Sequence, residues 1–420
     1  MLRCQTKSPT GDFCRARNGD AGRFRRTLVV ALALLSTATP LRAQSLPALK
    51  LTLEGRAEKV FDTATDKCAP VDMPDVNPRA YRAADGAIVM FALHYEARAL
   101  RGPDFAHLKI DCRVALHSTQ DPDPATYDGR RYLTSTWTSD GRRVAALIHD
   151  EYHADHHPGR CLFQGDLPCW WNTVLSFRSD DGGANFLASK PLVVAAAPFR
   201  QDVGQGRHRG FFSPSNMVGK DGYVYAFVST TGWEGQHFGA CLIRNRDPLD
   251  SAGWRGWDGR NFAVRWRDPY ASKASYDQAI CQPLEPFGFP VGAVLRHRGS
   301  GNWIALWEAP RVEGKFPTSG FYYATSRNLT DWSLPALLAA APTMHQPCGA
   351  GDSNRDGAVL SYPSLLDESA QGRNFDNAGD TPSLFYARVK NNGCIPGAER
   401  VLMRQKVRIT GARSASETRQ

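Results

Sequence analysis

The segment Ile148–His153 carries three side chains that could move protons or bind a metal. An extended chain alternates its side chains between two faces, so His149, Glu151 and His153 share one face. A carboxyl group beside imidazoles could form an acid/base pair, and the same donors could bind a metal ion. The residues Asp155–His157 follow directly, so a solvated polar loop is the third interpretation. The spacing differs from the helical His-Glu-x-x-His zinc motif.

Short strands in a repeated pattern must position these residues. A Gly-containing turn leads into an apolar strand four times, at 88–93, 144–148, 223–227 and 303–307, and a less regular fifth unit combines 360–366 with 383–388. Repeats of roughly 55 to 80 residues, each able to hold about four strands, predict an all-β fold, a five-bladed β-propeller. A six-bladed propeller with a degenerate unit around Leu49 to Val60 and a β-sandwich with long loops are the alternatives.

Strand ends in such a propeller converge on one mouth. The innermost strand of each blade starts there, and the second strand returns there. The starts of the inner strands supply Asp72, Asp75, Arg79, Ser213, Ser215 and Asn216. The ends of the second strands supply His94, Glu96, His149, Glu151, His153, Trp233, Glu308 and Arg311. This gathering of ionisable residues predicts a functional mouth.

The stretch Ser179–Phe186 predicts a tight turn between two strands. Its spacing is Ser-x-Asp-x-Gly-x-x-aromatic. The Asp carboxylate can accept backbone N–H groups, Gly supplies positive φ, and the ring anchors the turn. The pattern resembles the Asp-box of sialidases and related propellers, and Ser326–Trp332 resembles the strand-closing turns of five-bladed glycosidase propellers. An ordinary hairpin is the alternative, and the turn is structural in either case.

With these units, residues 60 to 408 resemble the five-bladed propellers of glycoside hydrolase family 43 and its relatives. The matching features are the aspartate-rich entry Asp72–Asp75, the repeated Asp-Gly-x-x-Tyr type hairpins and the strand Ser361–Ser364. Hydrolysis of a glycosidic bond needs two carboxyl groups, one protonated and one ionised. The resemblance implies a base on the inner strand of the first blade. Asp75 lies nearest to that position, and Asp72 is the backup.

Two glutamates compete for the role of general acid. Glu151 is preferred because aromatic neighbours could bury it and a facing histidine could orient it. Glu308, at the end of a strand, is the rival. Trp307 could stack on a sugar or pack in the core. Arg79 and Arg311 could bind a substrate carboxylate or hydroxyl through their planar guanidinium groups, or form surface ion pairs.

The expected substrate-binding set is Asp72, Arg79, His149, His153, Asn216, Trp307 and Arg311. One departure from the family pattern concerns the third blade, where an aspartate is implied and this chain has Ser213–Asn216. Another carboxylate arrangement, or sugar binding without catalysis, is therefore open. The sialidase alternative lacks a Phe-Arg-Ile-Pro sequence.

The N-terminus has the pattern of an export signal. Arg23, Arg25 and Arg26 precede an apolar run, Leu28–Leu35, and a cleavage site fits before Gln44. Residues 1–43 hold eight Lys/Arg and two Asp/Glu, so their removal lowers the formal net charge from +9 to +3. A nucleic-acid partner is therefore not expected. No later segment is long and apolar enough to predict a transmembrane span.

Eight cysteines remain after residue 43, an even number that predicts disulfides in an exported chain. Cys161 and Cys169 bracket a short loop and form the best-supported pair. Sequence order alone suggests three more pairs: Cys68 with Cys112, Cys241 with Cys281, and Cys348 with Cys394.

The sequence as a whole predicts a signal peptide at 1–43, one propeller domain at 44–408 and a flexible tail at 409–420. The expected function is that of a secreted or periplasmic glycoside hydrolase acting on carbohydrate without a cofactor or metal. A noncatalytic glycan-binding or cell-surface interaction propeller is the alternative.

Overall fold

Antiparallel strands account for about half of the described residues, as the repeated apolar segments predict. The computed structural model describes residues 45, 47–165, 167–200, 209–232, 235–271, 279–344, 346–348 and 354–411. All of them belong to one unit, Gln44–Gln420. The expected signal segment and Trp233 lie outside the described residues. Short 3₁₀ turns are η1 (Pro124–Thr126), η2 (Ala154–His156), η3 (Leu167–Cys169) and η4 (Ser251–Gly253).

Two sheets come from residues 74–256. The first has the order β2-β3-β4-β5, with bounds Pro74–Arg82, Ile88–Leu93, Ala99–Gly102 and Lys109–Ile110. The second joins two antiparallel groups. One contains β6 (Arg130–Trp137), β7 (Val144–His153), β8 (Trp170–Ser179) and β9 (Leu187–Ala195). The other contains β10 (Arg209–Phe212), β11 (Val218–Lys220), β12 (Tyr223–Thr230), β13 (Gly239–Asn245) and β14 (Arg255–Gly256). A short parallel pairing of β8 with β10 connects the two groups.

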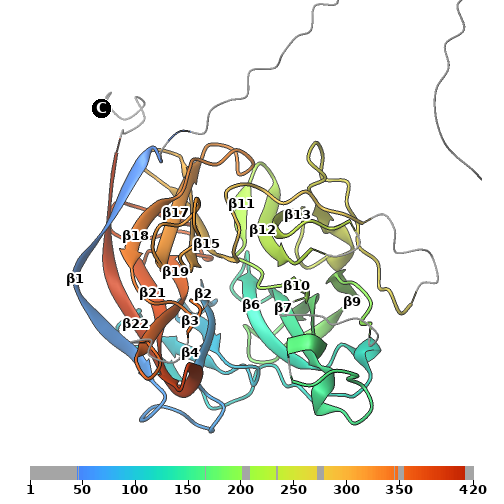
Figure 1. Cartoon of the computed structure of the whole chain (residues 1–420). Helices are drawn as coiled ribbons and strands as arrows, with labels where there is room; N and C mark the ends of the chain where they lie inside the picture. The colour runs from blue at the N-terminus through green and yellow to red at the C-terminus, as the bar shows by residue number, and fades with distance from the viewer. Residues whose placement is uncertain are drawn as a thin grey trace, which may run out of the picture. The chain divides into compact units, whose positions relative to one another are not determined.

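The other two sheets come from the second half of the chain, with one strand from its start. One has the order β18-β17-β16-β15-β20, with bounds Ala336–Ala340, Gly320–Ser326, Trp303–Ala309, Val291–His297 and Asn377–Ala378. The last has the order β1-β22-β21-β19, with bounds Leu49–Asp62, Ile395–Gly411, Ser383–Asn392 and Ala358–Leu366. Figure 1 shows the strand groups arranged around a common centre. The predicted all-β propeller fold is confirmed, and the number of blades stays a prediction.

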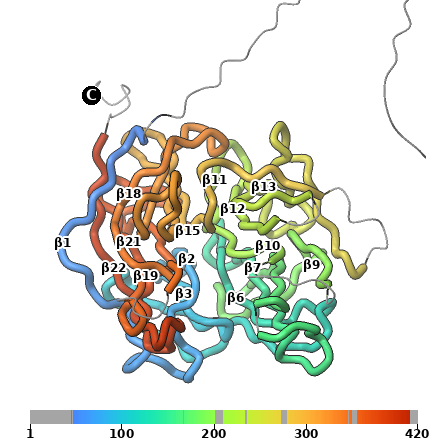
Figure 2. The backbone as a smooth tube through the Cα atoms, viewed as in Figure 1, coloured from blue at the N-terminus to red at the C-terminus, as the bar shows by residue number. Residues whose placement is uncertain are grey.

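The first strand closes the last sheet. β1 pairs with β22 from Leu49 opposite Gly411 to Asp62 opposite Val401, and the two run side by side in Figure 2. The six-bladed alternative assigns a separate unit to the region around Leu49, whereas the structure places this region in the last sheet. Because β22 continues to Gly411, the tail expected from residue 409 starts no earlier than 412, and residues 412–420 lie outside the described ones.

Arg79 joins the innermost strands at the centre. From β2, its Nε donates to the carbonyl of Thr134 on β6 at 2.6 Å. Its Nη1 donates to the carbonyl of Gly292 on β15 at 2.7 Å and to Ser364 Oγ on β19 at 3.2 Å. Its Nη2 donates to the carbonyl of Pro214, which follows β10, at 3.2 Å. Arg79 is 2% exposed, so it is a structural centre and not the expected substrate ligand.

The turn after β8 has the expected chemistry. Asp181 Oδ1 accepts the backbone N–H of Asn185 at 3.0 Å, and Gly183 has φ +89°. A Cβ on Gly183 would lie 1.9 Å from the Tyr81 hydroxyl, so only glycine fits. The ring of Phe186 is buried and meets Phe91 edge-on at 5.7 Å. The turn joins β8 to β9, as the sequence predicts.

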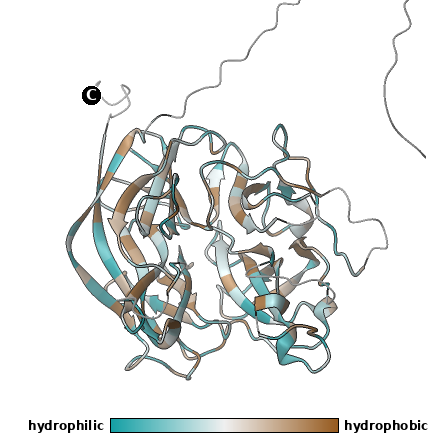
Figure 3. Cartoon of the chain, viewed as in Figure 1, coloured by the Kyte–Doolittle hydropathy of each residue, from teal (hydrophilic) through white to brown (hydrophobic). Residues whose placement is uncertain are grey.

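Apolar side chains fill the spaces between neighbouring sheets, and brown segments follow the strands in Figure 3. All four predicted disulfides are present, namely Cys68–Cys112, Cys161–Cys169, Cys241–Cys281 and Cys348–Cys394. Among the described residues, none of the helices is long and apolar enough to cross a membrane.

Candidate active site

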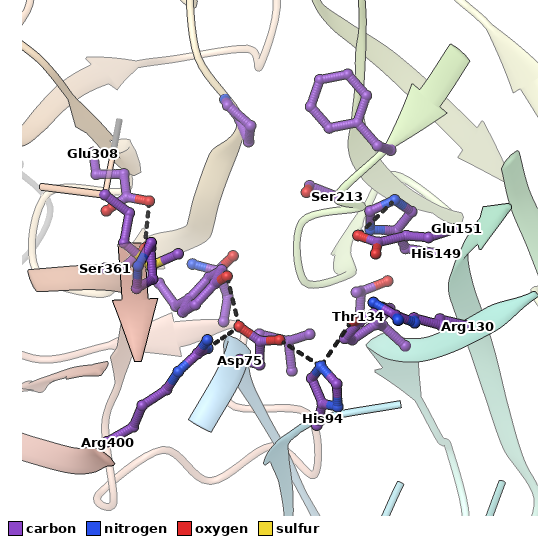
Figure 4. Close-up of a pocket in the computed structure, with 18 of the residues that line it drawn as sticks. Asp75, His94, Arg130, Thr134, His149, Glu151, Ser213, Glu308, Ser361 and Arg400 are labelled. Atoms are coloured by element: carbon purple, nitrogen blue, oxygen red, sulfur yellow. Dashed lines mark hydrogen bonds and ion pairs between the residues drawn. The ribbon is translucent and has the colours of Figure 1, made fainter. Parts of the chain in front are cut away.

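Strand ends from several sheets enclose a cavity of about 390 Å³. Three of its lining residues are the predicted catalytic carboxylates, Asp75 on β2, Glu151 on β7 and Glu308 on β16. In Figure 4, Glu308 and Glu151 lie on opposite sides, with Asp75 between them. Other lining residues are His94, Arg130, Tyr132, Thr134, His149, His153, Trp170, Phe212, Ser213, Met344, Ser361, Tyr362 and Arg400. The predicted convergence of strand ends brings these carboxylates to one site.

Asp75 accepts three polar contacts. The Tyr362 hydroxyl donates to Oδ1 at 2.9 Å, His94 Nε2 lies 3.0 Å from Oδ2, and the Arg400 guanidinium pairs with Oδ1. Burial opposes ionisation of Asp75, but the positive charge of Arg400 and the contact with His94 outweigh it and hold the pKa well below its usual range. Asp75 is therefore ionised at neutral pH.

His94 links Asp75 to a tyrosine. Its Nε2 lies 3.0 Å from the Tyr132 hydroxyl, and the two rings meet edge-on. Burial, together with the negative charges of Glu151 and Asp75, raises the pKa of Tyr132 well above its usual value. The Tyr132 hydroxyl therefore keeps its proton and can donate a hydrogen bond inside the cavity.

Glu151 lies between the two predicted histidines. His153 Nε2 is 3.2 Å from Oε2, and His149 Nε2 is 3.7 Å from Oε1. His149 Nε2 also contacts Asn172 Oδ1 at 2.7 Å, while the amide nitrogen of Asn172 donates to the carbonyl of Arg209. Burial lowers the pKa of His149 and so favours the neutral imidazole, and the contact with Asn172 Oδ1 favours the tautomer with the proton on Nε2.

Glu308 lines the facing wall, where the Ser361 hydroxyl on β19 donates to its Oε1 at 2.7 Å. Two residues of the cavity lining, Ser213 and Tyr362, have left-handed backbones with φ +46° and +56°. Such conformations cost energy outside glycine and are concentrated at functional sites. At Tyr362 the conformation coincides with a register shift of β19, which aims the phenol at Asp75.

Two other predicted binding residues hold backbone in place and do not line the cavity. Asp72 is fully buried, and its Oδ2 accepts the backbone N–H groups of Cys68 at 3.0 Å and Ala69 at 2.7 Å. Its Oδ1 pairs with Arg98 at 2.7 Å. Asn216 Nδ2 donates to a carbonyl of β15 at 2.7 Å and its Oδ1 accepts an N–H there at 2.7 Å. Asp72 therefore holds the backbone just before β2, and Asn216 holds the backbone just before β11.

Trp307 and Arg311 also lie away from the cavity lining. Trp307 is 0% exposed and packs in the core against Phe287, at 5.2 Å between ring centroids, and against Tyr322. Arg311 is exposed, and its backbone N–H donates to Gln346 Oε1 at 3.1 Å. The aromatic rings that do line the cavity are Trp170, Phe212, Tyr132 and Tyr362.

Sequence reasoning missed Arg400 and the roles of Tyr362 and Tyr132. Arg400 is separated from Asp75 by 325 residues and reaches it only because β22 lies in the last sheet. The spacing of residues near 400 gives no signal for this contact. The pattern Ser361–Ser364 predicts a strand but not the hydrogen bond that its tyrosine donates.

Asp150 carries a stability prediction. It lies on the opposite face of β7 from Glu151, and burial raises its pKa to about 7 although it accepts the Gly129 N–H at 2.9 Å. The folded protein therefore binds a proton that the unfolded chain, with a pKa of about 3.9, releases, so this residue lowers stability as the pH rises from about 4 to 7. Asp150→Asn keeps the acceptor, and its gain in unfolding free energy over the wild type should grow from pH 5 to pH 8. Urea titrations at both pH values measure it; an equal difference at both would contradict it.

No protein-family description matches this chain, and no curated protein matches it. Solved glycoside hydrolase structures are similar to it at low identity. A thermostable family-43 glycoside hydrolase is 10% identical, with 84% of this chain and 97% of that one covered and a TM-score of 0.42. A Cellvibrio cellulosa α-L-arabinanase complexed with arabinohexaose is 14% identical, covering 80% and 92%, with a TM-score of 0.44. A family-117 glycoside hydrolase from the marine bacterium Zobellia galactanivorans is 11% identical, covering 86% and 91%, with a TM-score of 0.46.

Proposed function

We propose that this protein is an exported glycoside hydrolase that uses paired carboxyl groups in the cavity. The observation that carries the proposal is the placement of Asp75, held ionised by Arg400 and His94, in the same cavity as Glu151 and Glu308. Hydrolysis of a glycosidic bond needs an ionised carboxylate on one side and a proton donor on the other.

In this proposal Asp75 is the base or nucleophile. In an inverting reaction it would take a proton from the attacking water, and in a retaining reaction it would bond to the sugar's anomeric carbon. The Tyr362 hydroxyl and His94 hold both of its oxygens, so its orientation is fixed before substrate binds. A fixed negative charge also stabilises the positive charge that develops on the sugar ring in the transition state.

Glu151 is the proposed acid, and Glu308 is the alternative. His149 and His153 position the Glu151 carboxyl group from two sides. Trp170 contacts His153 at 4.8 Å between ring centroids and lines the same cavity, so it can present an apolar face to a sugar ring. Glu308 accepts a hydrogen bond from Ser361 on the facing wall.

A noncatalytic glycan-binding protein is the second candidate. Ser213 lines the cavity at the third inner strand, where the resemblance to family 43 implies an aspartate. A cavity with aromatic walls and no working acid would bind sugar without hydrolysing it. Export rests on the signal-like pattern of residues 1–43 and on the four disulfides, which form in oxidising compartments.

Leaving-group dependence tests the acid assignment. A poor leaving group needs a proton from the enzyme, whereas dinitrophenolate leaves without one. We expect Glu151→Gln to lose at least about a hundredfold in kcat/KM on unactivated glycosides but much less on dinitrophenyl glycosides. Glu308→Gln should lose similar activity on both. Assays on a panel of pentosides and hexosides, with circular dichroism to verify folding, give the answer.

The reverse pattern would assign the acid role to Glu308. If the wild-type protein turns over none of the panel but binds its sugars in calorimetry, the noncatalytic candidate replaces the enzyme.

A further inference from the structure

Three metal-ligand side chains meet where β7 runs into η2. His153, Asp155 and His156 each place one donor atom within 4.8 Å of the others. His153 also lines the cavity, whereas Asp155 and His156 do not. The sequence predicted no metal, but this cluster has the donor types that a transition metal prefers.

Two atoms of this cluster are buried without a hydrogen-bond partner in the described part of the chain. They are His153 Nδ1 and Asp155 Oδ1. The His153 side chain is only 8% exposed, and its other nitrogen, Nε2, already faces Glu151 at 3.2 Å. A buried polar atom left unpaired is unfavourable, and in a native protein it calls for a water or an ion.

We propose that His153, Asp155 and His156 bind a divalent transition metal of the zinc class. Two imidazoles and one carboxylate, with water in the fourth position, are a common ligand set for Zn²⁺. His153 would bind through Nδ1 and His156 through Nε2, which lies 3.6 Å from Asp155 Oδ2. This site goes beyond the proposed function and does not depend on it.

The surroundings of His153 fit a metal ligand. A ligating histidine commonly donates its second N–H to a carboxylate, which fixes the ring and its tautomer. Glu151 occupies that position at His153 Nε2. Metal binding would therefore fix the His153 ring that contacts Glu151. Binding or loss of the metal would then affect the cavity through the His153 side chain.

Small movements complete the geometry. Tetrahedral Zn²⁺ with bonds of about 2.0 Å needs donors about 3.3 Å apart, so the cluster must contract. The His156 ring stacks on the His153 ring at 5.2 Å between centroids, and its side chain is 41% exposed, so it would have to turn its edge inward to bind the metal. Arg130 Nη2 lies 3.5 Å from His156 Nδ1, the nitrogen that would not bind the metal, so this weak contact does not compete with a metal at Nε2.

His157 provides a matched control. It is the next residue in the chain and also a partly exposed histidine, but it is not part of the cluster and stacks on Tyr152 at 5.6 Å.

The test uses the full chain, treated with chelator and free of tag histidines. Zn²⁺ is titrated by calorimetry, and Co²⁺ is added separately to record the visible absorption of a tetrahedral site.

We expect the wild type and His157→Ala to bind one Zn²⁺ per chain with equal affinity. Asp155→Asn and His156→Ala should each weaken binding at least about tenfold and lose the tetrahedral Co²⁺ spectrum. Melting temperatures without metal should agree among the four proteins, so a folding defect is recognised. Equal Zn²⁺ affinity in wild type and His156→Ala, an equal loss in His157→Ala, or no binding by the wild type would each overturn the proposal.

Discussion

Asp75→Asn is expected to reduce glycoside turnover by at least about a hundredfold, the largest loss among single changes in the cavity. The amide keeps the size of the side chain but cannot take a proton from water or bond to a sugar carbon. It also removes the charge that pairs with Arg400 and that would stabilise the transition state. The measurement is kcat/KM on the best substrate from the aryl glycoside panel.

Stability has to be measured beside that rate. Arg400 is largely buried, and removing its partner leaves a buried charge that can cost about 3–5 kcal/mol. Rates should be taken well below the melting temperature of the variant. Asp85→Asn is the matched control, because Asp85 is an exposed aspartate that pairs with Arg101 on the surface. A folded Asp75→Asn protein with full activity would remove Asp75 from the mechanism.

Arg79→Met is expected to destabilise the fold more than any other single change in the inner strands. Its guanidinium bonds to carbonyls at Thr134, Gly292 and Pro214, which belong to three different strand groups. Methionine would leave these acceptors buried and unpaired at about 1–3 kcal/mol each, partly offset because a buried charge is also removed. We expect a net loss of about 3 kcal/mol or more in unfolding free energy.

Urea titration followed by tryptophan fluorescence measures this loss. Arg101→Met is the control, since Arg101 is 37% exposed and pairs with Asp85 at the surface. Arg79→Lys should fall between the wild type and Arg79→Met, because one ammonium keeps the charge but cannot reach all of the acceptors of a planar guanidinium. An unchanged midpoint in Arg79→Met would show that the inner strands hold together without this centre.

Local patterns were sufficient to predict several of the strands and some of the turns that join them. The apolar segments at 88–93 and 303–307 became β3 and the start of β16, and the Ser179–Phe186 pattern became the turn between β8 and β9. These features depend on residues close together in the chain. The alternation of β7 also placed Glu151 and Asp150 on opposite faces, as the structure has them.

The cavity was harder to predict, because its partners come from distant strands. Nothing near Arg400 in the sequence indicates that it reaches Asp75, since that contact needs the last sheet to lie beside the first. Arg79 shows the opposite error. A cation at a strand start suggests a substrate ligand, although a guanidinium with five donors can equally satisfy backbone carbonyls in the interior. Composition and spacing do not distinguish these two environments.

The pairing of β1 with β22 sets the order in which folding can finish. Glu54 and Arg408 form an ion pair across this junction although 354 residues separate them in the chain. Contacts between such distant residues close large loops and slow the search for the native state. The last sheet cannot be completed until the final strand has been made, and until then β21 and β1 lack the strand that pairs with both of them. The protein should therefore fold late and slowly, and a partly synthesised chain will be prone to aggregate through the edges of β21 and β1.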